Sequence, residues 1–153
     1  MSFWLFLHVF GVILFVGNIM TAAFWKVRAD VGGHPEVIHS AARNVMLADY
    51  CFTLPGLLLI IVSGSLMAVQ GGHSIAGFNW LTASLILFAV TGVIWLAVLI
   101  PLQRRMIRYS REAIGAGRIS ADYKRASKLW AIYGTAATLL PVVILYLMIS
   151  QSI

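Results

Sequence analysis

The sequence contains very little charge. Of its 153 residues only 10% are charged, and aspartate and glutamate together number 5. Soluble domains carry roughly 25% charged residues, so this chain lacks the side chains needed to cover a water-facing surface. With a mean hydropathy of +0.92, the composition excludes a water-soluble enzyme and a disordered chain. It predicts an integral membrane protein.

Cysteine is almost absent as well. The one cysteine, Cys51, excludes an intrachain disulfide framework and a metal site of the CxxC type, and we expect its thiol to be buried. A pI near 10.0 would suit a nucleic-acid binder. However, no aromatic platform or groove-reading motif accompanies the basic residues, so we expect no nucleic-acid partner.

Long stretches without charge are abundant instead. Lys, Arg, Asp and Glu are missing from Met1–Trp25, Tyr50–Gln103 and Leu129–Ile153. Because about 20 apolar residues in a helix cross a bilayer, the middle stretch holds two crossings and the outer stretches hold one each. The prediction is an all-α fold, a polytopic membrane protein built as an antiparallel four-helix bundle in the single domain 1–153.

The boundaries follow from the charged and helix-breaking residues. The predicted spans cover residues 3–25, 46–69, 80–102 and 129–150. They are joined by connections at 26–45 and 103–128 and by a glycine-rich hairpin at 70–79. Within the connections, we expect Pro35 to begin a short helix and the third span to continue to Ile114. Gly115 and Gly117 should then end that helix, and Ser120 should cap the next one.

All eleven basic residues lie in or beside the two connections at 26–45 and 103–128. The positive-inside rule therefore predicts that both connections are cytoplasmic and that both termini lie on the outer side of a bacterial inner membrane. The basic cluster has two interpretations. It is either a contact for anionic lipids or a determinant of topology alone.

Small and polar side chains recur at helical spacing in every span, and we expect them to face the bundle interior because polar groups in hydrocarbon are costly. These stripes are His8, Gly11, Phe15, Asn18 and Ala22; Asp49, Thr53, Gly56, Ile60, Ser63 and Met67; Ser84, Phe88, Thr91 and Trp95; and Ala131, Thr135 and Thr138. The remaining tryptophans are expected at the membrane interface; they are Trp4, Trp25, Trp80 and Trp130.

Asp49 is the one acid that the pattern places inside or beside a span. A functional interpretation is a proton-accepting or cation-coordinating site formed with Asn18 and Thr53. The alternative is an interfacial ion pair or a helix N-terminal cap. Four basic residues lie at a suitable depth to pair with it: Lys26, Arg28, Arg43 and Arg104.

His8 lies about five residues inside the first span, where an imidazole can ligate haem iron, bind a transition metal or carry protons. With His73 of the outer hairpin it would form a bis-histidine site for haem b. With Met67 and Met148 it would suit Cu(I), which favours thioether ligands. The alternative is an interior histidine that is simply hydrogen-bonded.

Three segments carry a resemblance to known proteins. They are FWLFLHVFGVILFVGNIMTAAFWKV, RNVMLADYCFTLPGLLLIIVSGSLMA and IPLQRRM. Together they resemble a bacterial family of small predicted inner-membrane proteins of unknown function. More distantly, a histidine early in the first span followed by a glycine-bearing helix is similar to HemJ-type protoporphyrinogen oxidases and CopD-type copper-resistance proteins. The HemJ resemblance implies that His8 takes part in haem binding.

Three hypotheses for the function follow. The first is a small haem-binding or redox-associated membrane protein that uses His8. The second is a non-catalytic subunit or scaffold, whose partner is another membrane protein or a second copy of this chain. The third is a protein that handles copper or another ion through Asp49. No catalytic dyad or triad names a reaction.

Overall fold

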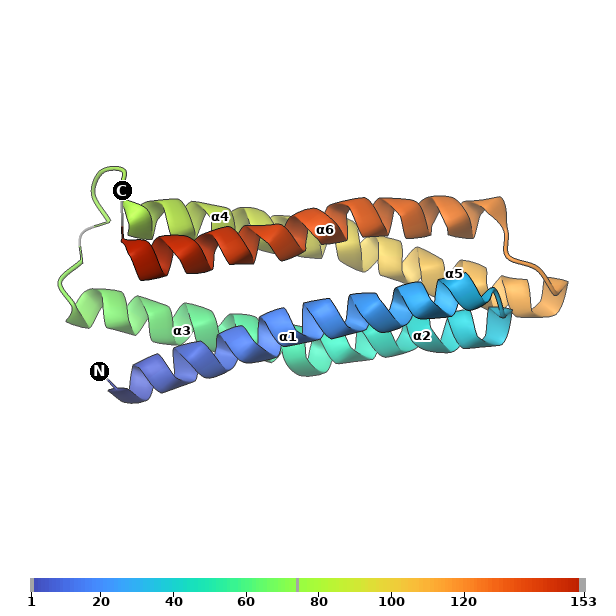
Figure 1. Cartoon of the computed structure of the whole chain (residues 1–153), viewed down its shortest axis with the longest axis horizontal. Helices are drawn as coiled ribbons and strands as arrows, with labels where there is room; N and C mark the ends of the chain where they lie inside the picture. The colour runs from blue at the N-terminus through green and yellow to red at the C-terminus, as the bar shows by residue number, and fades with distance from the viewer. Residues whose placement is uncertain (1, 74, 152–153) are drawn as a thin grey trace.

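The computed structural model describes residues 2–73 and 75–151, and every regular element within them is helical. The elements are α1 (Ser2–Gly32), α2 (Pro35–Ala48), η1 (Asp49–Thr53), α3 (Leu54–Gln70), α4 (Trp80–Ile94), η2 (Trp95–Leu99), α5 (Ile100–Ala116) and α6 (Ala121–Ser150). Because α2, η1 and α3 are continuous, as are α4, η2 and α5, they make four long helices (Figure 1). All four are long and apolar enough to cross a membrane. The predicted all-α four-helix bundle is confirmed.

These helices are longer than a bilayer requires. They contain 30 to 37 residues, which is roughly 45–55 Å at 1.5 Å per residue, whereas a hydrocarbon core is about 30 Å thick. The surplus lies at one end, where all eleven basic residues are found. We call residues 26–48 and 100–128 the basic end, and the rest of the bundle the apolar end.

The apolar end presents hydrophobic side chains outward, as a protein in contact with lipid must. Exposed examples from all four long helices are Phe6, Ile13, Leu58, Leu96 and Ile132. The first residue of α1 and the last residue of α6 lie together at this end (Figure 1). The lipid bilayer is therefore a partner of this protein, and the two described helix ends share one side of it.

The turns at the basic end are short and have the predicted chemistry. Between α1 and α2, Gly33 adopts φ +73°, which favours glycine, and Pro35 opens α2. Between α5 and α6, Gly117 adopts φ +68°, and the Ser120 hydroxyl accepts a hydrogen bond from the Tyr123 amide as an N-cap. Most of the two predicted connections is consequently helix.

The helices pair differently at the two ends. At the apolar end α1 packs on α3 and α4 packs on α6, and no described residue of α3 has its Cα within 8 Å of α4 or α6. Figure 1 shows these two pairs as separate layers. At the basic end α2 packs between α1 and α5, α5 packs on α6, and α6 returns to α1. The bundle is closed at the basic end and divided into two helix pairs at the apolar end.

Two glycines allow the close approach of α1 and α3. A Cβ atom on Gly11 would lie 2.9 Å from the Gly56 carbonyl oxygen, and a Cβ on Gly56 would lie 2.9 Å from the Gly11 carbonyl oxygen. Small residues at such crossings let helix backbones meet in a membrane, where no hydrophobic force holds helices together.

The predicted inward stripes are confirmed for the first three spans and wrong for the fourth. Most members of the first three are buried, including His8, Asp49 and Thr91. In α6, Ala131 and Thr135 are exposed, and the Thr135 hydroxyl donates 2.7 Å to the Ala131 carbonyl of its own helix. Because that bond satisfies the hydroxyl, the threonine tolerates lipid.

Two further expectations are wrong. Cys51 is exposed on η1, because Asp49 and Thr53 occupy the buried face of that turn. Trp130 is buried rather than placed as an interface anchor, and the Lys26 ammonium lies 5.0 Å from its ring centroid. A cation over an indole face is attractive, so Trp130 belongs to the bundle interior beside the basic end.

The α1–α3 contact predicts a difference between two glycines of one helix. Gly11→Ala should lower the free energy of unfolding by about 1–3 kcal/mol, because its methyl group would meet backbone across the helix pair. Gly17→Ala is the control, since nothing lies within 4 Å of that position. Thermal unfolding in detergent measures both, and equal stability of the two variants would contradict the close contact.

Candidate functional site

The Asp49 carboxylate is buried at the junction of the two ends and is only 6% exposed. Asn18 Nδ2 and Thr53 Oγ1 donate to Oδ1 at 3.0 and 2.8 Å. Gln103 Nε2 and Trp95 Nε1 donate to Oδ2 at 2.7 and 3.3 Å. A carboxylate offers about four acceptor sites, so neutral donors fill all of them. We call these five residues the Asp49 cluster.

A π-helical turn interrupts each of two long helices, α2–η1–α3 and α4–η2–α5, at the level of Asp49. In η1 the Leu54 amide donates to the Asp49 carbonyl, and in η2 the Ile100 amide donates to the Trp95 carbonyl. Each bond spans five residues, and a proline, Pro55 or Pro101, follows directly. A proline lacks an amide hydrogen and its ring clashes with the carbonyl four residues earlier, so the wider turn relieves that clash. Such turns occur often at functional sites.

The structure gives Asp49 no ion pair. Across residues 2–73 and 75–151 the salt bridge observed is Lys26–Asp30, so none of the basic residues considered for Asp49 pairs with it. Nor does Asp49 begin a helix, because α2 continues through it into η1. Both structural alternatives proposed for Asp49 are therefore wrong, and the predicted grouping with Asn18 and Thr53 is present.

Gln103 has an unusual position in the cluster. Its side chain is 2% exposed and its amide nitrogen is bonded to Asp49, yet its Oε1 is a buried acceptor without a hydrogen-bond partner among the described residues. An unpaired buried acceptor costs about 1–3 kcal/mol. The amide thus holds one unused acceptor beside the carboxylate.

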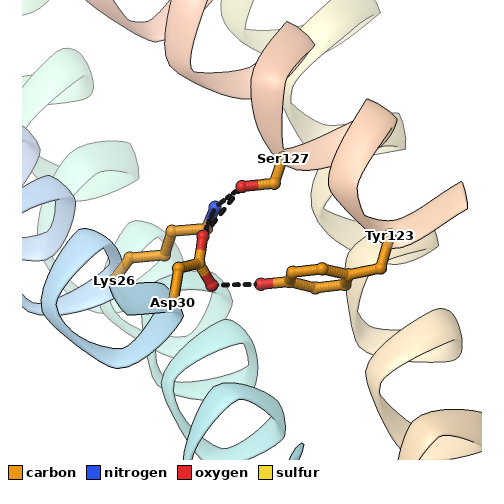
Figure 2. Close-up of polar contacts among 4 residues, drawn as sticks. All are labelled: Lys26, Asp30, Tyr123 and Ser127. Atoms are coloured by element: carbon orange, nitrogen blue, oxygen red, sulfur yellow. Dashed lines mark hydrogen bonds and ion pairs between the residues drawn. The ribbon is translucent and has the colours of Figure 1, made fainter. Parts of the chain in front are cut away.

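A second polar cluster joins α1 to α6 at the basic end. Lys26, which is 2% exposed, pairs with Asp30 Oδ2 at 2.5 Å and also donates to the Ser127 hydroxyl. Tyr123 Oη donates to Asp30 Oδ1 at 2.6 Å, and Ser127 Oγ donates to Oδ2 at 2.8 Å. Figure 2 shows the two α1 side chains facing the two from α6. This arrangement pairs every charge, which favours a structural role.

His8 lies at the apolar end against α3. Its Nδ1 is 3.2 Å from Ser63 Oγ, and the Ser63 hydroxyl donates its hydrogen to the Leu59 carbonyl. The Ser63 oxygen is then left to accept from Nδ1–H, so the lone pair of the neutral imidazole is on Nε2. The missing side chain of Gly64 makes room for the ring, since a Cβ there would lie 3.0 Å from His8 Cε1.

The other predicted ligands do not form one group with each other. His73 is exposed in the α3–α4 loop, with its ring edge-on to Trp80 at 5.4 Å between centroids. Met67 and Met148 are half-buried on α3 and α6, two helices that do not approach within 8 Å between Cα atoms where they are described. No group of three or more His, Cys, Asp or Glu that could hold a metal occurs among the described residues.

A groove of about 760 Å³ runs between α1 and α2 along the basic end. Asn18 and Ala48 lie at its inner limit, next to the Asp49 cluster, and Arg28 and Glu36 lie among its other lining residues. Seven of its fourteen lining residues are polar: Asn18, Thr21, Lys26, Arg28, Glu36, Ser40 and Asn44.

Comparison with known proteins identifies the family. The model of a family described as "predicted integral membrane protein (DUF2269)" matches residues 3–152. The chain belongs to this family. No curated protein and no solved structure matches it. The predicted resemblance to a family of small integral membrane proteins is confirmed, whereas the more distant likeness to HemJ-type and CopD-type proteins stays a prediction.

Several residues of the two polar clusters in this DUF2269 protein were not predicted as cluster members from the sequence. Trp95 was assigned only to an inward stripe, and Gln103 was treated as the end of a charge-free stretch. Asp30 was not considered as the partner of Lys26, although their spacing of four residues is the spacing of helical ion pairs. The usable signal for the cluster was a repeated spacing, because Asp49 and Trp95 each stand six residues before a proline.

The Lys26 cluster predicts a strong effect of removing its cation. Lys26→Met should lower the free energy of unfolding by about 2–3 kcal/mol, somewhat below the cost for fully buried pairs, because the Asp30 side chain is 23% exposed. Lys128→Met, at an exposed position of α6, is the control. In a double-mutant cycle with Asp30→Asn the two losses should not add; additive losses would contradict the pairing.

Proposed function

We propose that this protein handles protons in a bacterial inner membrane and that Asp49 is the group that binds them. The basic end is cytoplasmic in this proposal, because it holds all the lysines and arginines, and both termini lie outside. The observation that carries the proposal is a buried carboxylate that has no salt-bridge partner among the described residues and is surrounded by four neutral donors. An ionisable residue within membrane helices marks a functional site by default.

The neutral surroundings suit a reversible change of charge. Had Asp49 been paired with a lysine or arginine, protonation would leave that cation buried and alone, which is costly. With neutral donors, hydronium gives its proton to a carboxylate oxygen and remains as water, the carboxylate becomes a neutral carboxylic acid, and no buried cation is left without its partner. The four hydrogen bonds offset the desolvation of the carboxylate in its charged form.

Gln103 suits both forms of Asp49. Its Nε2 donates to the carboxylate, and its free Oε1 can accept from the O–H of the carboxylic acid once the amide rotates by half a turn. The acceptor that is unsatisfied in the charged state thereby gains a partner in the neutral state. The cluster has hydrogen-bonding groups for each protonation state without any backbone movement.

Asp49→Asn tests this function directly. Infrared difference spectra of the purified protein between high and low pH should contain a protonated carboxyl band that Asp49→Asn removes. Proton uptake by the protein, measured with a pH indicator, should fall by about one proton per chain over the same pH change. Asp122→Asn, at an exposed position in the first turn of α6, is the matched control.

Two results would reject the proton proposal. One is an unchanged carboxyl band and unchanged proton uptake in a folded Asp49→Asn variant. The other is a wild-type protein whose buried carboxyl group never changes its protonation state. If the protein also co-purified with another membrane protein in fixed proportion, the alternative of a non-catalytic subunit or scaffold would be favoured instead.

A second candidate function is haem binding through His8. It is supported by the orientation of the ring, because Ser63 holds Nδ1–H and leaves Nε2 with a lone pair, the form in which histidine ligates iron. His8 would then be a residue that holds haem b. His73, exposed in the loop, is the histidine predicted as the second ligand.

The haem candidate makes a separate prediction. After expression with ample haem, the protein should show a Soret band that shifts on reduction and that His8→Ala abolishes. His73→Ala should alter the band only if His73 is the second ligand, and His34→Ala, in the α1–α2 turn, should leave it unchanged. A folded, colourless wild-type protein would reject haem binding and would leave the Asp49 proposal untouched.

A further inference from the structure

The α1–α2 groove leads to the Asp49 cluster from one side only. Its inner limit is formed by Asn18, whose amide donates to the Asp49 carboxylate, and by Ala48, the residue before Asp49. On the opposite side of Asn18, α1 and α3 are in contact at Gly11 and Gly56. Phe15, which is 2% exposed, fills the space next to that contact. Within the described residues, α1 is therefore in close contact with α3 toward the apolar end, and the groove separates α1 from α2 toward the basic end.

The outer wall of the groove belongs to a segment that faces water. On α2 the exposed positions include Glu36, Ser40, Arg43 and Asn44, whereas the buried positions are Ile38, Ala42 and Val45. A helix with charged residues outward and apolar residues inward is typical of an aqueous surface, and charges do not face hydrocarbon. The groove is thus bordered by water along most of α2.

The polar half of the lining can hold water, and the other half, which includes Trp25 and Val37, is apolar. Arg28 and Glu36 bring opposite charges to the polar half, so the lining does not favour an anionic or a cationic solute. Lys26 also borders the groove, but its ammonium is engaged by Asp30 and Ser127. Small alanines, among them Ala22, Ala41 and Ala48, leave the space open, and the hydroxyl and amide groups of Thr21, Ser40 and Asn44 supply partners for water molecules.

We infer that the α1–α2 groove is a water-filled half-channel through which protons from the basic end reach Asp49. This inference rests on the proposed function. When one of the four donors withdraws from a carboxylate oxygen of Asp49, hydronium in the groove releases its proton to that oxygen and remains as water, and the reverse step returns the proton to the same side. Asn18 is a positioning residue at the inner end of the route, because it holds both Asp49 and Thr53.

The first test measures whether the groove contains water. In a Cys51→Ala background, Thr21→Cys should react with a charged, membrane-impermeant thiol reagent applied to the basic end in oriented vesicles. Thr135→Cys is the matched control, because Thr135 is also exposed and also bonded to a carbonyl of its own helix, but lies on the outer face of α6. It should be at least tenfold less reactive. Labelling of Thr21→Cys by a lipid-soluble reagent alone would show an acyl chain in the groove and would overturn the inference.

The second test measures the route itself. Ala41→Phe places a large side chain in the groove and should slow hydrogen–deuterium exchange of the Asp49 carboxyl group, followed by its infrared band, by about tenfold or more. Ala136→Phe, at an exposed position of α6 outside the groove, should leave the rate unchanged. The extent of protonation at equilibrium should be the same in both variants, because neither touches the cluster.

The outcomes separate the route from the function. A carboxyl band that Asp49→Asn removes, with an exchange rate that Ala41→Phe does not change, would overturn the half-channel and keep Asp49 as the proton site. A reactive Thr21→Cys in a protein without any titrating Asp49 band would reject both the proton function and the route for protons, and would leave a hydrated groove without that role.

Discussion

The uncompensated carboxylate of Asp49 is the constraint that organises the centre of this bundle. A charge removed from water must be satisfied by hydrogen bonds or by an opposite charge, and here the donors come from α1, η1, η2 and α5. Three of the four long helices, all except α6, therefore contribute a hydrogen bond to this one side chain. The two π-helical turns lie at the same level, so the backbone irregularity and the buried charge occur at one place.

The two ends of the molecule are stabilised by different interactions. At the apolar end, lipid surrounds the helices and close packing between small residues holds α1 against α3. At the basic end, α2 and α5 are amphipathic, and a core of apolar residues such as Ile38 and Met106 is buried as in a soluble bundle. Hydrogen bonds of Tyr123 and Ser127 with the Lys26–Asp30 pair add a polar link between α1 and α6. Asp49 lies where these two kinds of packing meet.

The sequence was sufficient for the number of helices, the fold class and several details of the turns, because hydropathy, proline and glycine act locally. Pro35 and Ser120 were recognisable as helix starts for this reason. The inward face of α6 was not predictable in the same way, since Thr135 satisfies its hydroxyl within its own helix and gives a misleading polar signal.

The partners of Asp49 show the same difference between local signals and contacts that depend on packing. Asn18 and Thr53 were found because both lie on regular helical stripes. Trp95 and Gln103 come from a helix distant in the sequence, and single-sequence periodicity does not say which faces of two helices meet. Whether Asp49 forms an ion pair or a neutral cluster also depends on the rotamer of Lys26. That side chain pairs with Asp30 on its own helix and not with Asp49.

The division of the apolar end into two helix pairs has a mechanical consequence. Among the described residues no Cα atom of α3 lies within 8 Å of one in α4 or α6, whereas the opposite end is a closed ring of helices. The two pairs are packed together at the basic end, whereas at the apolar end the chain between α3 and α4 links them, so lateral pressure in the bilayer would act on the two pairs separately there. Asp49 accepts hydrogen bonds from both pairs, so a change in the angle between the pairs would alter those bonds.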